Sequence, residues 1–144
     1  MDASLFRVPM RFLLFAGCCL FVFVVLGPLI GTFIFCLFTS PSSAFSPVFL
    51  LFAVFSYALA GALPLGSCLL FWGVCFLAVK FFKLEGLNLL ANGVIGFLCG
   101  AAAVSLHFFR ESSFDVGWLI TSALFCGVVS AICGVLVAVF SKKF

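Results

Sequence analysis

Charged side chains are scarce in this sequence: only 8% of its 144 residues are Asp, Glu, Lys or Arg, and only four of these are acidic. A soluble domain has about 25% charged and about 45–50% apolar residues, whereas this chain is 67% hydrophobic and has a mean hydropathy of +1.49. No water-soluble fold of this length could bury so much apolar surface. The composition therefore excludes a soluble enzyme, a secreted domain and a disordered chain, and it predicts an integral membrane protein of one domain.

The residue combinations that perform catalysis or hold a metal are also missing. His107 is the single histidine, and no aspartate or glutamate lies inside any long apolar segment. A nucleophile with its base, a carboxylate pair or a proton relay therefore cannot be assembled within the membrane. The eight cysteines include no C-x-x-C pair and no spacing typical of zinc, and a buried thiol behaves as a small hydrophobic side chain. We expect no enzymatic activity, no metal and no cofactor.

Long uncharged segments are what the sequence does contain. A helix needs about 20 apolar residues to cross the roughly 30 Å hydrocarbon core of a membrane. Pro41 and Pro47, with five hydroxyl residues around them, divide the first uncharged stretch in two. Four transmembrane helices are then predicted, over residues 12–38, 48–79, 86–109 and 116–140. The sequence thus predicts an all-α membrane protein, a four-transmembrane-helix antiparallel bundle that forms a single domain over residues 1–144.

The basic residues predict the orientation of these helices. Four crossings place both termini and the middle loop on one side, which holds six of the seven Lys and Arg residues: Arg7, Arg11, Lys80, Lys83, Lys142 and Lys143. Only Arg110 is left for the other side. Because Lys and Arg near helix ends mark the cytoplasmic side, both termini are predicted to be cytoplasmic. Basic side chains at that surface suit anionic lipid headgroups, so the expected partner is the lipid bilayer and not nucleic acid.

The second segment is too long for one straight helix. Its 32 residues would extend about 48 Å at 1.5 Å per residue, and Pro64 removes one backbone hydrogen bond within it. We therefore expect this helix to be kinked or broken near Pro64. Two alternatives stay open: a tilted, kinked helix, or a broken helix whose free carbonyls line a polar cavity. Gly27 and Pro28 predict a second, milder kink in the first helix.

A stripe of polar and small residues follows one face of the third segment. Its members recur at steps of three or four, as residues on one helix face do: Glu85, Asn88, Asn92, Gly96, Gly100, Ala103 and His107. Gly96 and Gly100 form a G-x-x-x-G pair, which permits the close approach of another helix. Small residues also repeat at every fourth position of the fourth segment, at Ser130, Gly134 and Ala138. We interpret the stripe and the region of Pro64 as helix-packing features; the alternative is a path for an ion or solute.

Two motifs in the first half of the chain resemble a known pattern. GPLIG at residues 27–31, followed by SYALAGALP at residues 56–64, is similar to a pattern in uncharacterised small bacterial inner-membrane proteins with four spans. The resemblance implies an integral protein of the bacterial inner membrane and no particular activity. In the second half, Asn92, Gly96 and Gly100 are similar to the pore helix of small fluoride channels. The helix break and the N-terminal motif of that family are missing, so we do not assign the chain to it.

These observations predict a small non-enzymatic polytopic membrane protein. We expect it to act by helix–helix contact, as an accessory subunit or a partner-binding protein, because several helices carry small-residue faces and the loops are short. Its partner is expected to be another membrane protein or a second copy of the chain. The alternative is a homo-oligomeric channel or transporter for a small ion or solute, which would use the polar stripe of the third segment.

Overall fold

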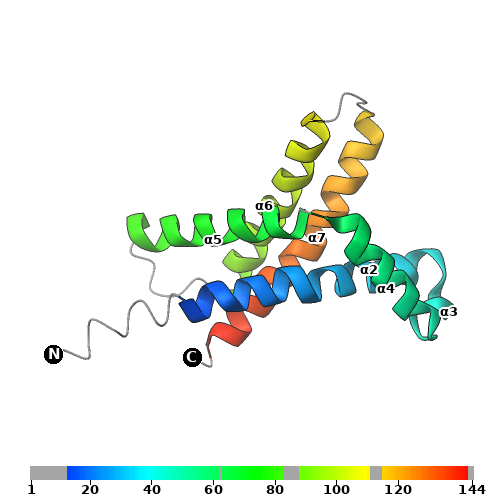
Figure 1. Cartoon of the computed structure of the whole chain (residues 1–144). Helices are drawn as coiled ribbons and strands as arrows, with labels where there is room; N and C mark the ends of the chain where they lie inside the picture. The colour runs from blue at the N-terminus through cyan, green and yellow to red at the C-terminus, as the bar shows by residue number, and fades with distance from the viewer. Residues whose placement is uncertain (1–12, 62, 83–87, 111–114, 143–144) are drawn as a thin grey trace.

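The computed structural model describes residues 13–61, 63–82, 88–110 and 115–142 (Figure 1). These ranges contain no strand, and their helices are η1 (Phe21–Leu26, a π-helix), α2 (Gly27–Thr39), α3 (Pro41–Ala44), α4 (Val48–Ala60), α5 (Leu63–Phe82), α6 (Leu89–Arg110) and α7 (Val116–Ser141). Residues 13–20 are also helical and continue into η1 and α2, so that Leu13–Thr39 is one helix of 27 residues, called here the first helix. The predicted all-helical fold is confirmed.

Within the described ranges, three helices are long and apolar enough to cross a membrane: the first helix, α6 and α7. Their ends lie within three residues of the first, third and fourth predicted segments. From the second predicted segment come α4, of 13 residues, and the apolar part Leu63–Ala78 of α5, and neither is among these candidates. The structure thus supports a membrane protein with three candidate spanning helices, and the number four stays a prediction.

The second predicted segment, residues 48–79, is two helices and not one. α4 ends at Ala60, and Gly61 follows with φ 51° and ψ −123°, a conformation that residues with a Cβ atom rarely adopt. Pro64 is then the second residue of α5, where a missing N–H and a fixed φ cost little. α4 therefore ends four residues before Pro64. Of the two alternatives, a broken helix is observed, and a continuous kinked helix is not.

The first helix widens where the sequence predicted a mild kink. Phe21–Leu26 form a π-helical turn, and the N–H of Gly27 donates to the carbonyl oxygen of Val22, five residues earlier. Pro28 follows directly, and in a regular α-helix its ring would crowd the carbonyl four residues earlier. The extra residue in the turn relieves that contact. The predicted kink is thus a change of helical pitch within a helix that continues to Thr39.

The helices form two antiparallel pairs that cross each other (Figure 1). In the first pair, α4 packs against α2 and α5 packs against η1, so α4 and α5 together follow the first helix back along its length. In the second pair, α6 and α7 form a hairpin that lies across the first pair, and its outer half extends beyond the other helices. The arrangement is more open than the side-by-side bundle that the sequence predicted.

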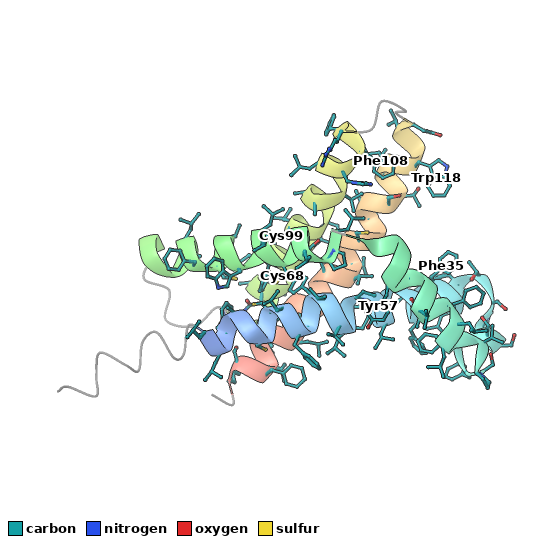
Figure 2. The ribbon with its side chains drawn as sticks, in the orientation of Figure 1. Phe35, Tyr57, Cys68, Cys99, Phe108 and Trp118 are labelled. Carbon is teal, nitrogen blue, oxygen red and sulfur yellow. The ribbon has the colours of Figure 1, made fainter. Side chains whose placement is uncertain are left out.

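The core lies where the two pairs cross. Its buried members are Cys19, Val22, Phe23, Cys68, Phe71, Cys75, Cys99, Cys133 and Val137. Phe71 has no exposed surface, and its ring centroid lies 5.1 Å from that of Phe23. Five of these core residues are cysteines, and Figure 2 shows Cys68 of α5 and Cys99 of α6 near the crossing. All eight cysteines of the chain are free, so thiols fill this core as small side chains.

Candidate functional site

α6 and α7 approach each other so closely that glycine is needed at several positions. A Cβ atom added to Gly96 would lie within 3.0 Å of the Ser130 carbonyl oxygen, and one added to Gly100 would lie equally close to the Ser130 hydroxyl oxygen. The contact is reciprocal, because a Cβ atom on Gly134 of α7 would meet the Asn92 carbonyl oxygen of α6. Small residues permit this kind of backbone contact between membrane helices.

The other residues of the predicted stripe do not form one continuous site. Asn92 is buried, donates a hydrogen bond from Nδ2 to the Asn88 carbonyl oxygen (3.2 Å), and has its Oδ1 4.0 Å from the Cys75 thiol of α5. Asn88 is exposed just before α6 begins, and His107 is exposed near the other end of that helix. Glu85 lies outside the described residues. The stripe is therefore a packing face in its middle and an exposed surface at its two described ends.

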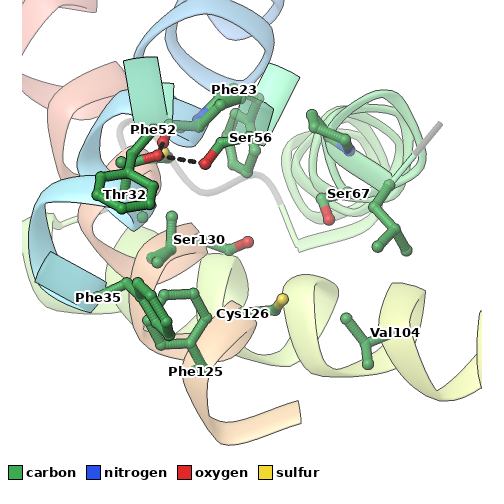
Figure 3. Close-up of a pocket in the computed structure, with 17 residues that line it drawn as sticks. Phe23, Thr32, Phe35, Phe52, Ser56, Ser67, Val104, Phe125, Cys126 and Ser130 are labelled. Atoms are coloured by element: carbon green, nitrogen blue, oxygen red, sulfur yellow. Dashed lines mark hydrogen bonds between the residues drawn. The ribbon is translucent and has the colours of Figure 1, made fainter. Parts of the chain in front are cut away.

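A cavity of about 440 Å³ lies where the first helix, α4, α5, α6 and α7 meet (Figure 3). Four aromatic rings border it: those of Phe23, Phe35, Phe52 and Phe125. Four hydroxyl groups lie between the rings: those of Thr32, Ser56, Ser67 and Ser130. Among the described residues, no carboxylate, amine, guanidinium or imidazole group belongs to the lining. The site is thus uncharged and mostly apolar, with hydrogen-bonding groups contributed by several helices.

Both helix irregularities border this cavity. Pro28, two residues after the end of the π-helical turn, lines it from the first helix, and Leu63 and Pro64 line it from the start of α5. A hydrogen bond shows where along the first helix these irregularities lie. The Tyr57 hydroxyl of α4 donates to the carbonyl oxygen of Val25, which is near the middle of the 27-residue first helix. Among the described site residues that the sequence predicted, Pro64 alone lines the cavity. The cavity therefore lies near the mid-depth of the first helix pair.

Two of the four hydroxyl groups are hydrogen-bonded to described residues, and two are not. Thr32 donates to the Pro28 carbonyl oxygen of its own helix (2.7 Å), and its oxygen lies 2.6 Å from the Ser56 hydroxyl oxygen of α4. Because a threonine has one hydroxyl hydrogen, Ser56 is then the donor to Thr32. Ser67 and Ser130 are each 6% exposed and form no hydrogen bond with any described residue. Figure 3 shows their oxygens directed into the space between the helices.

Reasoning from the sequence did not group these hydroxyl residues, because they lie on four different helices. A local signal was present: Thr32 follows Pro28 by four residues, and Ser67 follows Pro64 by three, so each lies one turn beyond a proline. Proline marks the place where a helix is irregular, and a hydroxyl one turn later lies beside that irregularity.

Comparisons with protein-family models, with curated proteins and with solved structures give no match for this chain. The functional proposal below therefore rests on the geometry of the helices and of the cavity.

Proposed function

We propose that this chain is a non-enzymatic membrane protein that acts by helix–helix contact, as an accessory subunit or a partner-binding protein of the bacterial inner membrane. The observation that carries the proposal is an unused glycine face on α5. Gly66 and Gly73 are seven residues apart, hence on one helix face, and a Cβ atom at either position would have no atom within 4 Å. Leu69 lies between them on that face and is 62% exposed.

This α5 face differs from the other glycine pairs of the chain. α7 packs directly against Gly96 and Gly100. A Cβ atom added to Gly27 or Gly31 would lie 3.6 Å from a side chain of α7. In lipid the association of helices depends on close packing at small residues, so a glycine pair that none of the described helices covers is suited to a helix of another protein. The partner is then a transmembrane helix, from another membrane protein or from a second copy of this chain.

Four crossings with both termini in the cytoplasm belong to the same proposal. α4 and α5 together supply the second crossing, interrupted at Gly61, and the six basic residues near helix ends support the orientation. The non-enzymatic role is supported by the described lining of the cavity, where no acid, base or charged group that could take part in catalysis is found among the residues of the structure's described ranges.

Leucine at both Gly66 and Gly73 is expected to abolish the association. The added side chains hold a partner helix away, and overpacking of about 1–3 kcal/mol weakens binding by about 5- to 150-fold. The protein is purified in mild detergent from its native membranes and its mass is analysed with that of any co-purifying protein. The unaltered chain should retain a membrane partner or form an oligomer, and the double variant should not.

Ala102→Leu is the matched control for this experiment. Ala102 is an exposed small residue on α6, so the substitution also adds a leucine side chain to an apolar helix surface, away from the glycine face. It should leave the association intact. A monomer without any partner, or an equal loss in the control and the double variant, would contradict the proposal.

A second candidate function, a channel or transporter, is favoured by one observation. The break at Gly61 and the π-helical turn lie beside the same mid-depth cavity, and discontinuous helices at mid-depth form the substrate sites of many transporters. If the protein conducts an ion or solute, reconstituted liposomes should show flux that Ser67→Leu blocks at the cavity. Asn92→Leu would block it only if the path followed the stripe instead. No flux in liposomes that contain the purified protein would exclude this candidate.

A further inference from the structure

We propose that the cavity binds an uncharged, membrane-soluble lipid that carries a hydroxyl or carbonyl group, with its oxygen held between Ser67 of α5 and Ser130 of α7. This site is distinct from the glycine face of α5 and does not depend on it, because neither Gly66 nor Gly73 belongs to the lining. The cavity volume, about 440 Å³, lies in the range of about 300–1,000 Å³ that is usual for ligand sites.

The two serines carry the proposal because both line the cavity and neither hydroxyl has a hydrogen-bond partner among the described residues, although the Ser130 oxygen also lies beside Gly100 of α6. Each is 6% exposed, and within the described ranges neither hydroxyl forms a hydrogen bond. Four other helical hydroxyls bond to a carbonyl one turn earlier in their own helix: those of Thr39, Ser105, Thr121 and Ser141. Each serine oxygen keeps some accessible surface in the cavity, so a group that occupies the cavity can supply the missing hydrogen bond. A ligand oxygen between the two serines would do so.

The lining also decides the class of ligand. Its described residues include no charged group, so an ion or a charged headgroup would enter without compensation for the water that it loses. Aromatic and aliphatic side chains form most of the wall, which suits a hydrocarbon body. A hydroxyl can both donate and accept a hydrogen bond, so the two serines can hold an alcohol or a carbonyl group alike.

The ligand can reach the cavity from the lipid. Phe35 and Phe52 line the cavity and are also 54% and 45% exposed on the surface of α2 and α4. Their rings therefore lie at an edge where the cavity meets the apolar exterior of the helices. An uncharged lipid dissolved in the bilayer needs no aqueous passage to enter there.

The test uses the full chain in liposomes with a photoactivatable long-chain alcohol as the probe. We expect saturable labelling of residues around the cavity, on α2, α5 and α7, located by mass analysis of the labelled peptides. Unlabelled long-chain alcohol and a quinone should compete, which distinguishes hydroxyl from carbonyl ligands by their relative strength. Hexadecane, which has no oxygen, and palmitate, which is charged, should compete at least tenfold less well.

The double variant Ser67→Ala, Ser130→Ala should bind the probe about tenfold more weakly, since two hydrogen bonds are lost. Ser105→Ala is the control, because Ser105 is half-buried on α6, outside the cavity, and bonds to its own helix. Ser67→Leu, which fills the space, should remove saturable labelling, with the thermal unfolding of each variant measured in parallel. Equal competition by hexadecane, unchanged binding in the double variant, or the absence of saturable labelling in the unaltered chain would each overturn the proposal.

Discussion

Replacing Gly100 by alanine is expected to destabilise the protein by about 1–3 kcal/mol, the usual cost of overpacking. The added methyl group would lie within 3.0 Å of the Cys126 carbonyl oxygen and of the Ser130 hydroxyl oxygen, so α7 must move as a whole. Gly100→Leu should separate the hairpin of α6 and α7 altogether. The measurement is the midpoint of unfolding in a denaturing detergent titration, followed by circular dichroism.

Gly73→Ala provides a control with the same chemical change. No atom lies within 4 Å of a Cβ atom at this position, and alanine is the better helix former by up to about 1 kcal/mol. This variant should therefore be unchanged or slightly more stable. Leu98→Ala should also have little effect, because Leu98 is 61% exposed on the outer face of α6. An equal shift of the unfolding midpoint in Gly73→Ala and Gly100→Ala would contradict the close packing of α6 on α7.

The pairing of α6 with α7 shows how far small-residue spacing can be interpreted from sequence. Steps of three and four placed Gly96 and Gly100 on one face, and the repeat that contains Ser130 and Gly134 is the surface that meets them. The spacing could not identify the partner, because the first helix carries a similar pair at Gly27 and Gly31. Only the crossing of the two helix pairs determines which small faces touch.

The irregular helices show which features could not be predicted from the sequence. Proline predicted an interruption near residue 64, but a proline fits both the first turn of a helix and a kink within one. The positive φ of Gly61 decides between these, and a sequence does not state a dihedral angle. The π-helical turn depends on a single extra residue in Phe21–Leu26, where every side chain is apolar. The cavity could not be predicted for the same reason, since its walls are positioned by both irregularities.

The last prediction concerns how many times the chain crosses the membrane. Because the second predicted segment is broken into α4 and α5, three and four crossings are the alternatives. Reporter domains are fused after Ser43, Lys83 and Ser113 and at the C-terminus, with one reporter active outside the cytoplasm and another fluorescent within it. Four crossings predict an external Ser43, a cytoplasmic Lys83, an external Ser113 and a cytoplasmic C-terminus. If α4 and α5 did not cross, Lys83 and the C-terminus would be external and Ser113 would be cytoplasmic.

We expect the four-crossing result for two independent reasons. α4 packs against α2 and α5 against η1, so the broken pair follows the first helix from its Thr39 end back toward its Leu13 end. The 13 residues of α4 and the 20 of α5 add about 20 and 30 Å of helix, which matches the roughly 40 Å of the first helix when the pair is bent. Three crossings would also place four basic residues outside: Lys80, Lys83, Lys142 and Lys143. Because basic residues near helix ends resist transfer to that side, a cytoplasmic signal after Ser113 would contradict both the charge distribution and the pairing of α4 and α5 with the first helix.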